Sequence, residues 1–480
     1  MACDEEFCKD YLVLKPEEGS LFDLVRILRS SELDKREFVE FSGVGKLIRG
    51  LEYRWIVSVS FLAQKLLLYL KKPLARIGFL LEMWLNLLSS NGGAFFPFLL
   101  NTLKGNFVWP NRTSATFTSV VGNLDLRVEL DKNMRNGDRR YATSLSMMAA
   151  KLAYENAAFV QTIVTEHWNM EFLGFFSFWN DYQNQSSTQA IMFHDTSTNS
   201  DLIMVAFRGT EPFDADKWCT DVDISWYELE NVGRIHGGFM KALGLQKGKG
   251  WPKKIEQGLN EKSYAYYTIR QKLRDLLQKH EKAKFVVTGH SLGGALAILF
   301  AAVLGFHEEE GLLNRLEGVY TFGQPRVGNK KFGEFMEGKM RKYDVRYIRF
   351  VYCNDIVPRL PYEGRTLLFK HFGTCLYYNS CYKGKVVWEE PNKNYFSVLW
   401  AIPKILNAVW ELIRSFIIPY IKGSDYKEGW FLRFVRVFGL AVPGLSAHGP
   451  EDYVNVTRLG SLHSLLSSQG LIQQQGLKHE

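Results

Sequence analysis

A G-x-S-x-G pattern, Gly289-His290-Ser291-Leu292-Gly293, contains the residues of this chain that are best arranged for chemistry. It lies between a β-branched run that ends at Val287 and a small, apolar run that begins at Ala295. We therefore expect a buried strand, a sharp turn at Ser291 and a helix over residues 295–304. Such a turn strains the serine backbone and brings the strand close to the helix, so small residues must flank it. The pattern predicts a nucleophilic serine, as in serine hydrolases; the alternative is an incidental serine in a glycine-rich loop.

A serine hydroxyl is a weak nucleophile at neutral pH, so Ser291 needs a base and a carboxylate that orients the base. In α/β-hydrolases both follow the serine, the carboxylate first and the histidine second. Asp355 follows a predicted strand over 347–352, at the carboxyl end, where sheets of this kind carry their catalytic residues. A solvated turn aspartate is equally compatible with the spacing. His448 lies among turn residues and is the preferred base, while His371, whose neighbours predict another strand, is the rival.

The negative charge that develops on a reacting carbonyl oxygen needs backbone N–H donors. Leu292 supplies one donor because it directly follows the serine. Thr210 is the candidate for the second donor, since a Gly-Thr turn ends the predicted strand 202–207; the alternative is an ordinary hairpin turn. This chemistry requires no metal ion and no cofactor, and the six cysteines have no zinc-binding spacing.

From about residue 139 onward, strand-like and helix-like segments alternate. The predicted strands are 190–194, 202–207, 318–322 and 347–352, and the predicted helices are 142–159, 263–282 and 295–304. This alternation predicts an α/β fold with a mostly parallel central sheet covered by helices. We assign 139–465 to this domain, with an amphipathic helical insert at 395–421 that either contacts lipid, roofs an acyl-binding groove or packs on the sheet. Residues 466–480 are expected to be a frayed tail.

The chain before this domain changes character at about residue 51. Residues 1–50 are mixed and polar, whereas 51–105 are dominated by two helix-length apolar runs separated by Lys71-Lys72-Pro73. Polar and charged residues interrupt both runs, so neither reaches the roughly 18 apolar residues of a membrane span. We expect a helical anchor on a lipid surface, with the two lysines at headgroup level; the alternative is a helical subdomain that packs on the protein's own core.

Composition limits the partners and the compartment. A total of 59 Lys and Arg against 51 Asp and Glu gives a net charge of +8, which slightly favours an anionic lipid surface, and no basic tract with interleaved aromatics points to nucleic acid. The acidic start Cys3-Asp4-Glu5-Glu6 is unlike a secretory signal, and the scattered cysteines form no dense disulfide framework. We expect a cytosol-facing protein that is not secreted. The sequence does not determine the oligomeric state.

Five ordered motifs resemble those of the class 3, fungal-type triacylglycerol lipases. They are Phe207-Arg208-Gly209-Thr210, His236-Gly237-Gly238-Phe239, the segment 289–297, the segment 321–329, and Asn354-Asp355-Ile356-Val357-Pro358. The resemblance covers about residues 142–453, and the apolar N-terminal region together with the long insert before His448 is similar to the plant oil-body lipases.

This resemblance implies an α/β-hydrolase fold, a triad of Ser291, Asp355 and His448, and oxyanion donors at Thr210 and Leu292. It also implies a lid at 211–230, which carries Trp218 and Trp226. The implied activity is hydrolysis of triacylglycerol at a lipid droplet or membrane surface through an acyl-enzyme. A phospholipase A1 or galactolipase would use the same triad, and a non-catalytic droplet coat protein is a third alternative.

Overall fold

The computed structural model describes residues 8–20, 22–24, 38–42, 51–132, 134, 140–180, 183–197, 201–244, 262–361, 369–395 and 397–460. The predicted tail 466–480 and much of the predicted polar segment 1–50 lie outside the described residues.

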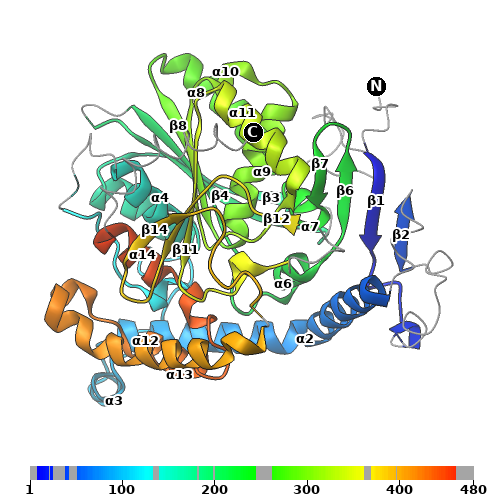
Figure 1. The fold of residues 1–480 in the computed structure, drawn as a ribbon. Helices are drawn as coiled ribbons and strands as arrows, with labels where there is room; N and C mark the ends of the chain where they lie inside the picture. The colour runs from blue at the N-terminus through cyan, green and yellow to red at the C-terminus, as the bar shows by residue number, and fades with distance from the viewer. Residues whose placement is uncertain are drawn as a thin grey trace.

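An eight-stranded sheet with the strand order β14-β13-β11-β9-β8-β5-β4-β3 forms the centre of the molecule (Figure 1). Its strands are β3 Glu171–Asn180, β4 Gln185–Asp195, β5 Leu202–Phe207, β8 Lys284–His290, β9 Leu316–Phe322, β11 Arg346–Tyr352, β13 Thr374–Tyr378 and β14 Gly384–Val387. The four predicted strands are therefore confirmed.

The directions of these strands agree with the expectation of a mostly parallel sheet at its centre but not at its edges. The central strands β5, β8, β9, β11 and β13 are parallel to one another. At one edge β14 is antiparallel to β13, and at the other edge β3, β4 and β5 alternate in direction. The sheet is mixed because short connections join the edge strands, and a short connection can only reverse the chain, whereas parallel neighbours need a crossover.

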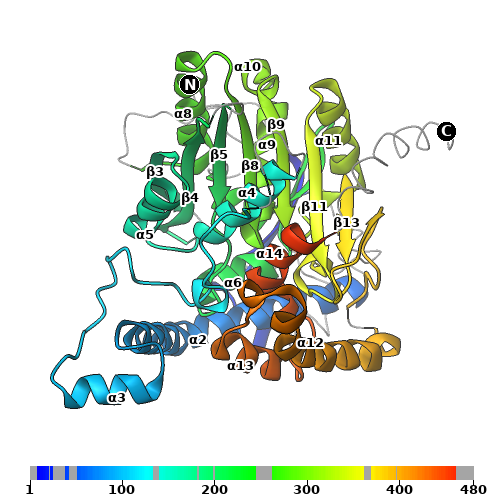
Figure 2. The same cartoon turned by 90° about the vertical axis from the view of Figure 1, so that its left-hand side faces the viewer.

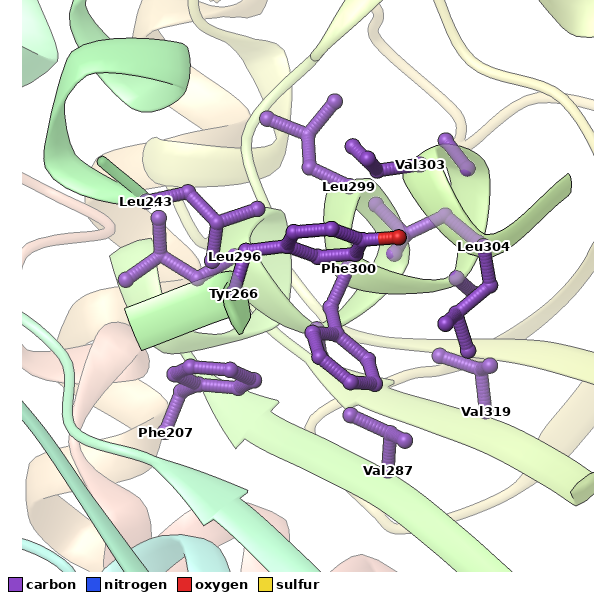
Figure 3. Packing of buried hydrophobic residues seen from close by; sticks show 14 of the residues in the cluster. Phe207, Leu243, Tyr266, Val287, Leu296, Leu299, Phe300, Val303, Leu304 and Val319 are labelled. Atoms are coloured by element: carbon purple, nitrogen blue, oxygen red, sulfur yellow. The ribbon is translucent and has the colours of Figure 1, made fainter. Parts of the chain in front are cut away.

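Helices cover both faces of the central sheet (Figure 2). These helices are α4 Tyr141–Leu152 and α14 Pro450–Leu459 on one face, and α8 Ala265–Lys279 and α9 Leu292–Phe306 on the other. Along β8, Phe285 and Val287 pack on the α9 side and Val286 packs on the α4 side, as alternation along a strand requires. Figure 3 shows the α9 side, where Phe300 lies over Val287 of the sheet. This core fixes the position of the turn between β8 and α9.

The predicted helix over 142–159 is two helices. It breaks after Leu152, and α5 Ala157–Thr162 begins with a cap in which the Asn156 side chain accepts a hydrogen bond from the Phe159 N–H at 3.0 Å. Asparagine is a strong N-cap residue, which explains the restart at this position.

A second, antiparallel sheet includes the start of the chain. Its order is β12-β10-β7-β6-β1-β2, with β1 Cys8–Leu14, β2 Val39–Ser42, β6 Trp226–Leu229, β7 Gly233–His236, β10 Gly328–Asn329 and β12 Phe369–Lys370. Strand β1 pairs with β6, and Leu12 and Leu14 are buried. Residues 8–14 are thus a strand of the fold.

Four helices lie in one layer along one end of the molecule, below the sheet in Figures 1 and 2. They are α2 Leu51–Ser90, α3 Phe95–Leu103, α12 Ala401–Lys422 and α13 Trp430–Gly439. No helix within the described ranges is long and apolar enough to cross a membrane.

The two predicted apolar runs form a single 40-residue helix, α2, with Pro73 inside it. Proline removes one hydrogen bond from a helix, but here α2 packs along α6 (Ala215–Val222) and the residues before α6 on both sides of that proline. The Gln64 carbonyl accepts from the Cys219 thiol, and a Cβ on Gly78 would lie 2.7 Å from Phe213. These contacts hold the helix against the protein on both sides of the proline.

Candidate active site

Ser291 occupies a strained turn between β8 and α9. Its φ is 58° and its ψ is −132°, a backbone conformation that costs a non-glycine residue of order 1–3 kcal/mol. A Cβ on Gly289 would lie 2.1 Å from the carbonyl carbon of Gly293, and a Cβ on Gly293 would lie 2.2 Å from the carbonyl oxygen of Phe207. Both glycines are therefore required for the strand and the helix to meet, as the pattern predicts.

The structure brings His448 and Asp355 into a direct hydrogen bond across 93 residues of sequence. The His448 Nδ1 lies 2.8 Å from Asp355 Oδ2 and 3.0 Å from Oδ1. Because Nδ1–H donates to the carboxylate, the lone pair of neutral His448 lies on Nε2. That Nε2 is buried and has no hydrogen-bond partner among the described residues. A base with an oriented ring and an uncommitted nitrogen is what a serine nucleophile needs.

Two further donors hold the Asp355 carboxylate. The Tyr453 hydroxyl donates to Oδ2 at 2.5 Å, and the Val357 N–H donates to Oδ1 at 2.9 Å. Burial and the nearby Asp355 charge raise the pKa of Tyr453 well above its usual value, so this hydroxyl keeps its proton. Gly323, with φ 59°, lies beneath the pair, and a Cβ there would be 2.9 Å from Asp355 Oδ2 and from the His448 ring. Sequence reasoning did not identify Tyr453, since its position five residues after His448 carries no local signal.

His290 supports the His448 ring from below. The two rings stack with centroids 4.6 Å apart, and His290 Nε2 lies 2.9 Å from the His448 carbonyl oxygen. A carbonyl only accepts, so Nε2 carries the proton and Nδ1 accepts from the Tyr154 hydroxyl at 2.9 Å. Burial, together with the nearby His448, lowers the pKa of His290 well below its usual value, so His290 is a neutral platform. Sequence reasoning did not assign this function to His290 or Tyr154.

The predicted oxyanion donors lie beside the turn. Leu292 is the first residue of α9, and the first N–H groups of a helix have no partner within the helix. The loop of Thr210 packs on the same turn, since a Cβ on Gly209 would lie 2.5 Å from the His290 carbonyl oxygen. The Thr210 hydroxyl donates to Asp221 Oδ2 at 2.8 Å. Burial raises the pKa of Asp221 to about 7.

The site is largely shielded from solvent. Only 5% of Ser291, 4% of Leu292 and 7% of Thr210 is exposed. Helix α6, which holds Asp221, lies at this turn, and its Lys217 lines a small cavity together with Leu292. Access of a bulky substrate ester to Ser291 is therefore restricted.

The predicted lid segment 211–230 consists of two different parts. Trp218 is partly exposed on α6, and its indole N–H donates to the Pro212 carbonyl at 3.1 Å. Trp226 is instead a core residue of β6, 1% exposed, with its indole N–H on the Tyr53 hydroxyl and Arg234 stacked over its ring. The expectation that Trp226 belongs to a lid is therefore wrong, because pairing with β1 and β7 fixes its strand in the second sheet.

The rival base His371 lies in a separate polar cluster. Its Nε2 is 2.6 Å from the Pro358 carbonyl oxygen, so this nitrogen carries a proton and is not free to accept another. Burial, with Arg349 nearby, lowers the pKa of His371 well below its usual value.

One group of side chains in the described ranges could in principle bind a metal ion. The ligand atoms of His194, Asp201 and His280 lie within 4.8 Å of one another. However, His194 Nε2 and Asp201 Oδ1 are only 2.5 Å apart, which is a histidine–carboxylate hydrogen bond. Because the proton of that bond occupies the position a metal ion would take, we assign no metal to the group.

Comparisons with known proteins show which family the chain resembles. A family model described as Lipase (class 3) matches residues 204–364. Over 95% of both chains, the protein is 41% identical to triacylglycerol lipase OBL1 of Nicotiana tabacum. Over 96% of both chains, it is 43% identical to triacylglycerol lipase OBL1 of Arabidopsis thaliana. The solved triacylglyceride lipase of Rhizomucor miehei matches with 22% identity and a TM-score of 0.37, over 51% of this chain and 81% of that one.

The protein belongs to the class 3 lipase family. Its likeness to the two plant proteins extends over nearly their whole length and therefore includes chain on both sides of the segment 204–364.

Proposed function

We propose that this protein is a triacylglycerol lipase in which Ser291, His448 and Asp355 hydrolyse acyl esters through an acyl-enzyme. The observation that carries the proposal is the strained serine turn beside a histidine whose Nδ1–H is held by a buried carboxylate. The names of the two full-length plant relatives support triacylglycerol as the substrate.

In the first half-reaction, the Ser291 Oγ attacks the ester carbonyl carbon while His448 Nε2 takes the hydroxyl proton. The carbonyl oxygen becomes an oxyanion, which the N–H groups of Leu292 and Thr210 stabilise. The C–O bond to the glyceride then breaks, and His448 returns its proton to the leaving alkoxide, which departs as the alcohol. Asp355 stabilises the imidazolium throughout and stays ionised.

In the second half-reaction, a water molecule replaces the alcohol. His448 removes one proton from this water as its oxygen attacks the acyl carbon, and the oxyanion forms again. The bond to the Ser291 Oγ then breaks, the serine regains a proton from His448, and the fatty acid leaves. The cycle consumes one water molecule and needs no metal ion or redox cofactor.

The buried site implies a gate, and we assign this function to α6 with Trp218. Helix α2 holds α6 in place, because the Ser60 hydroxyl donates to the Val222 carbonyl at 2.7 Å and Lys71 pairs with Asp216 at 2.7 Å. The outer side of α2 exposes large apolar side chains, among them Trp55, Leu62, Leu66, Ile77, Leu80 and Trp84. We propose that 51–105 rests on a lipid droplet or membrane surface, and that contact of α2 with lipid is transmitted to α6.

The same region also packs on the protein, as the second sequence-based alternative for 51–105 expects, and the proposed lipid contact belongs to the opposite side of the helix. Tyr53, Val57 and Phe61 are fully buried. The described cysteines, Cys8, Cys219, Cys353, Cys375 and Cys381, are all unpaired, which supports a reducing, cytosol-facing location.

Covalent labelling with a fluorophosphonate probe tests whether the serine is activated. The unsubstituted protein should be labelled, and Ser291→Ala should not. Absence of labelling in the unsubstituted protein, under conditions that label a known lipase, would favour the non-catalytic coat protein. His448→Ala should also abolish labelling, whereas His371→Ala should keep it if the protein folds; the reverse result would reassign the base.

Product analysis decides the substrate class. Triacylglycerol, diacylglycerol and phosphatidylcholine are presented as separate emulsions of matched surface area, with Ser291→Ala as the blank. We expect fatty acid release to be fastest from triacylglycerol. Faster release from phosphatidylcholine would favour the phospholipase A1 alternative.

A further inference from the structure

Helix α12 buries its charged side chains and exposes its apolar ones, which is the reverse of a helix on a surface that faces water. The charged residues between its ends, Lys404, Glu411 and Arg414, are all buried. Its exposed side chains from Ile402 to Ile421 are apolar or aromatic: Ile402, Pro403, Ile405, Leu406, Val409, Trp410, Ile413, Phe416, Ile417, Tyr420 and Ile421. A surface helix normally presents its charged side to water, so this arrangement exposes the wrong side for an aqueous boundary.

Helix α13 repeats the reversal beside it. Arg436 is buried, while Trp430, Phe434, Val437 and Phe438 are exposed. Both helices lie in the same layer as α2 and α3 in two perpendicular views (Figures 1 and 2). The exposed side chains of α12 and α13 are called the insert face below.

Buried ion pairs hold the charged side of the insert against the catalytic domain. Arg414 pairs with Asp452 at 2.6 Å and also donates to the Tyr352 hydroxyl at 2.6 Å. Arg436 pairs with Glu428 at 2.6 Å and with Asp452 at 3.1 Å. Breaking such a buried pair costs several kcal/mol, so each helix is fixed with its apolar side outward.

The ion pairs of Arg414 and Arg436 connect the insert to the elements that carry the proposed base and its carboxylate. Asp452 adjoins Tyr453, whose hydroxyl holds Asp355, and Tyr352 ends the strand before Asp355. Helix α13 leads through residues 440–445 directly to the turn Ser446–His448. The insert face is therefore rigidly connected to the catalytic groups.

The chemistry of the insert face favours lipid over a protein partner. Protein interfaces contain about one hydrogen bond per 100–200 Å². Among the exposed side chains of α12 from Ile402 to Ile421, only the Trp410 indole and the Tyr420 hydroxyl can form one. Tryptophan and tyrosine are the residues enriched where hydrocarbon meets headgroups. At the end of α12 the exposed Lys422 and Lys427, with Asp425 between them, offer a net positive rim to anionic headgroups.

We propose that the insert face is a second lipid-docking surface, which sinks into the phospholipid monolayer of a neutral-lipid droplet and fixes the orientation of the catalytic domain on it. The proposal rests on the lipase function proposed above and adds the insert to the region 51–105 as a binding element. In this arrangement α12 lies flat in the monolayer, because its buried charges keep one side on the protein.

Flotation with artificial droplets tests the proposal. The droplets are triolein coated with phosphatidylcholine and phosphatidylserine, and all proteins carry Ser291→Ala so that hydrolysis does not alter the surface. The test variant combines Leu406→Glu and Phe438→Glu, whose side chains are 64% and 60% exposed and thus contribute little to internal packing. Because region 51–105 also binds, each variant is measured with and without Phe96→Glu on α3.

We expect the double variant to weaken droplet partitioning on the order of tenfold, and to abolish flotation when Phe96→Glu is also present. Gln278→Glu is the control for an added negative charge, which it places on an exposed position of α8, at the opposite end of the molecule (Figure 1). It should float like the parent. Thermal unfolding of each variant checks that it is folded.

The proposal is overturned if the folded double variant floats like the parent in both backgrounds. It is also overturned if the parent is a dimer in solution that the double variant dissociates without loss of flotation, since the occupant is then a second copy of the chain. Failure of the proposed lipase function would appear separately, as absence of fluorophosphonate labelling in the protein with Ser291 intact.

Discussion

Tyr453→Phe tests whether the hydroxyl beneath Asp355 positions the catalytic pair. The substitution removes a donor 2.5 Å from Asp355 Oδ2 and an acceptor 3.3 Å from the Tyr352 N–H, while the ring can stay in place. A hydrogen bond to a charged group contributes about 1.5–3 kcal/mol, and a neutral one contributes about 1 kcal/mol. We therefore expect the free energy of unfolding to fall by about 2.5–4 kcal/mol.

We expect kcat to fall as well, because Oδ2 accepts from both Tyr453 and His448. Without the tyrosine hydroxyl, Asp355 keeps the Val357 N–H on its other oxygen but can rotate, and the imidazole orientation is then less well defined. The loss should be about tenfold and should appear in kcat more than in KM, since the hydroxyl does not touch substrate. The assay is steady-state hydrolysis of a soluble short-chain ester, together with urea unfolding.

Tyr378→Phe is the matched control. Tyr378 is also a buried tyrosine, but its hydroxyl has no hydrogen-bond partner among the described residues. Its removal should leave kcat unchanged and leave the free energy of unfolding unchanged or slightly higher. If Tyr453→Phe behaves like Tyr378→Phe in both measurements, the positioning function of Tyr453 is refuted; if stability falls and kcat does not, the hydroxyl is structural only.

Three further predictions address the gate, a buried acid and the serine turn. Activity should rise when ester exceeds its solubility limit, and Trp218→Asp should reduce that rise; a smooth rate curve that is unaffected by the substitution would contradict the assignment of α6 as the gate. Burial raises the pKa of Asp221 to about 7 in the folded state, so folding favours the neutral carboxyl. The contribution of this group to the free energy of unfolding is therefore complete below about pH 4 and is lost by about pH 7. Urea unfolding at pH 5 and pH 8 should show this loss of stability for the parent but not for Asp221→Asn. The loss amounts to at most about 4 kcal/mol over the whole pH range. An equal pH dependence of stability in both proteins would contradict the raised pKa of Asp221. Gly289→Ala should cost at least about 3 kcal/mol in thermal unfolding or prevent folding, because its Cβ would meet Gly293 at 2.1 Å, whereas Gly311→Ala, with nothing within 4 Å, should be neutral or stabilising.

Features that depend on neighbours in the chain were predictable from the sequence. The turn at Ser291, its two glycines and the flanking strand and helix follow from local sterics and apolar pattern, and the structure has β8 and α9 there. The central strands could be located because each is a short apolar run between polar segments. The pattern also located Asp355 at a strand end. It left both His371 and His448 as candidates for the base, since spacing alone does not determine which histidine folds back onto the serine turn.

Features that depend on contacts between distant segments were decided only by the tertiary structure. Trp226 is a core residue because β1, more than 200 residues earlier, pairs with its strand. Tyr453, Tyr154 and the tautomer of His290 acquire their functions from partners that no local signal identifies. An amphipathic pattern gives two sides to a helix but does not say which side faces the protein. In α12 the charged side faces inward, because Arg414 contacts Asp452 and Tyr352 there, and the apolar side is left exposed.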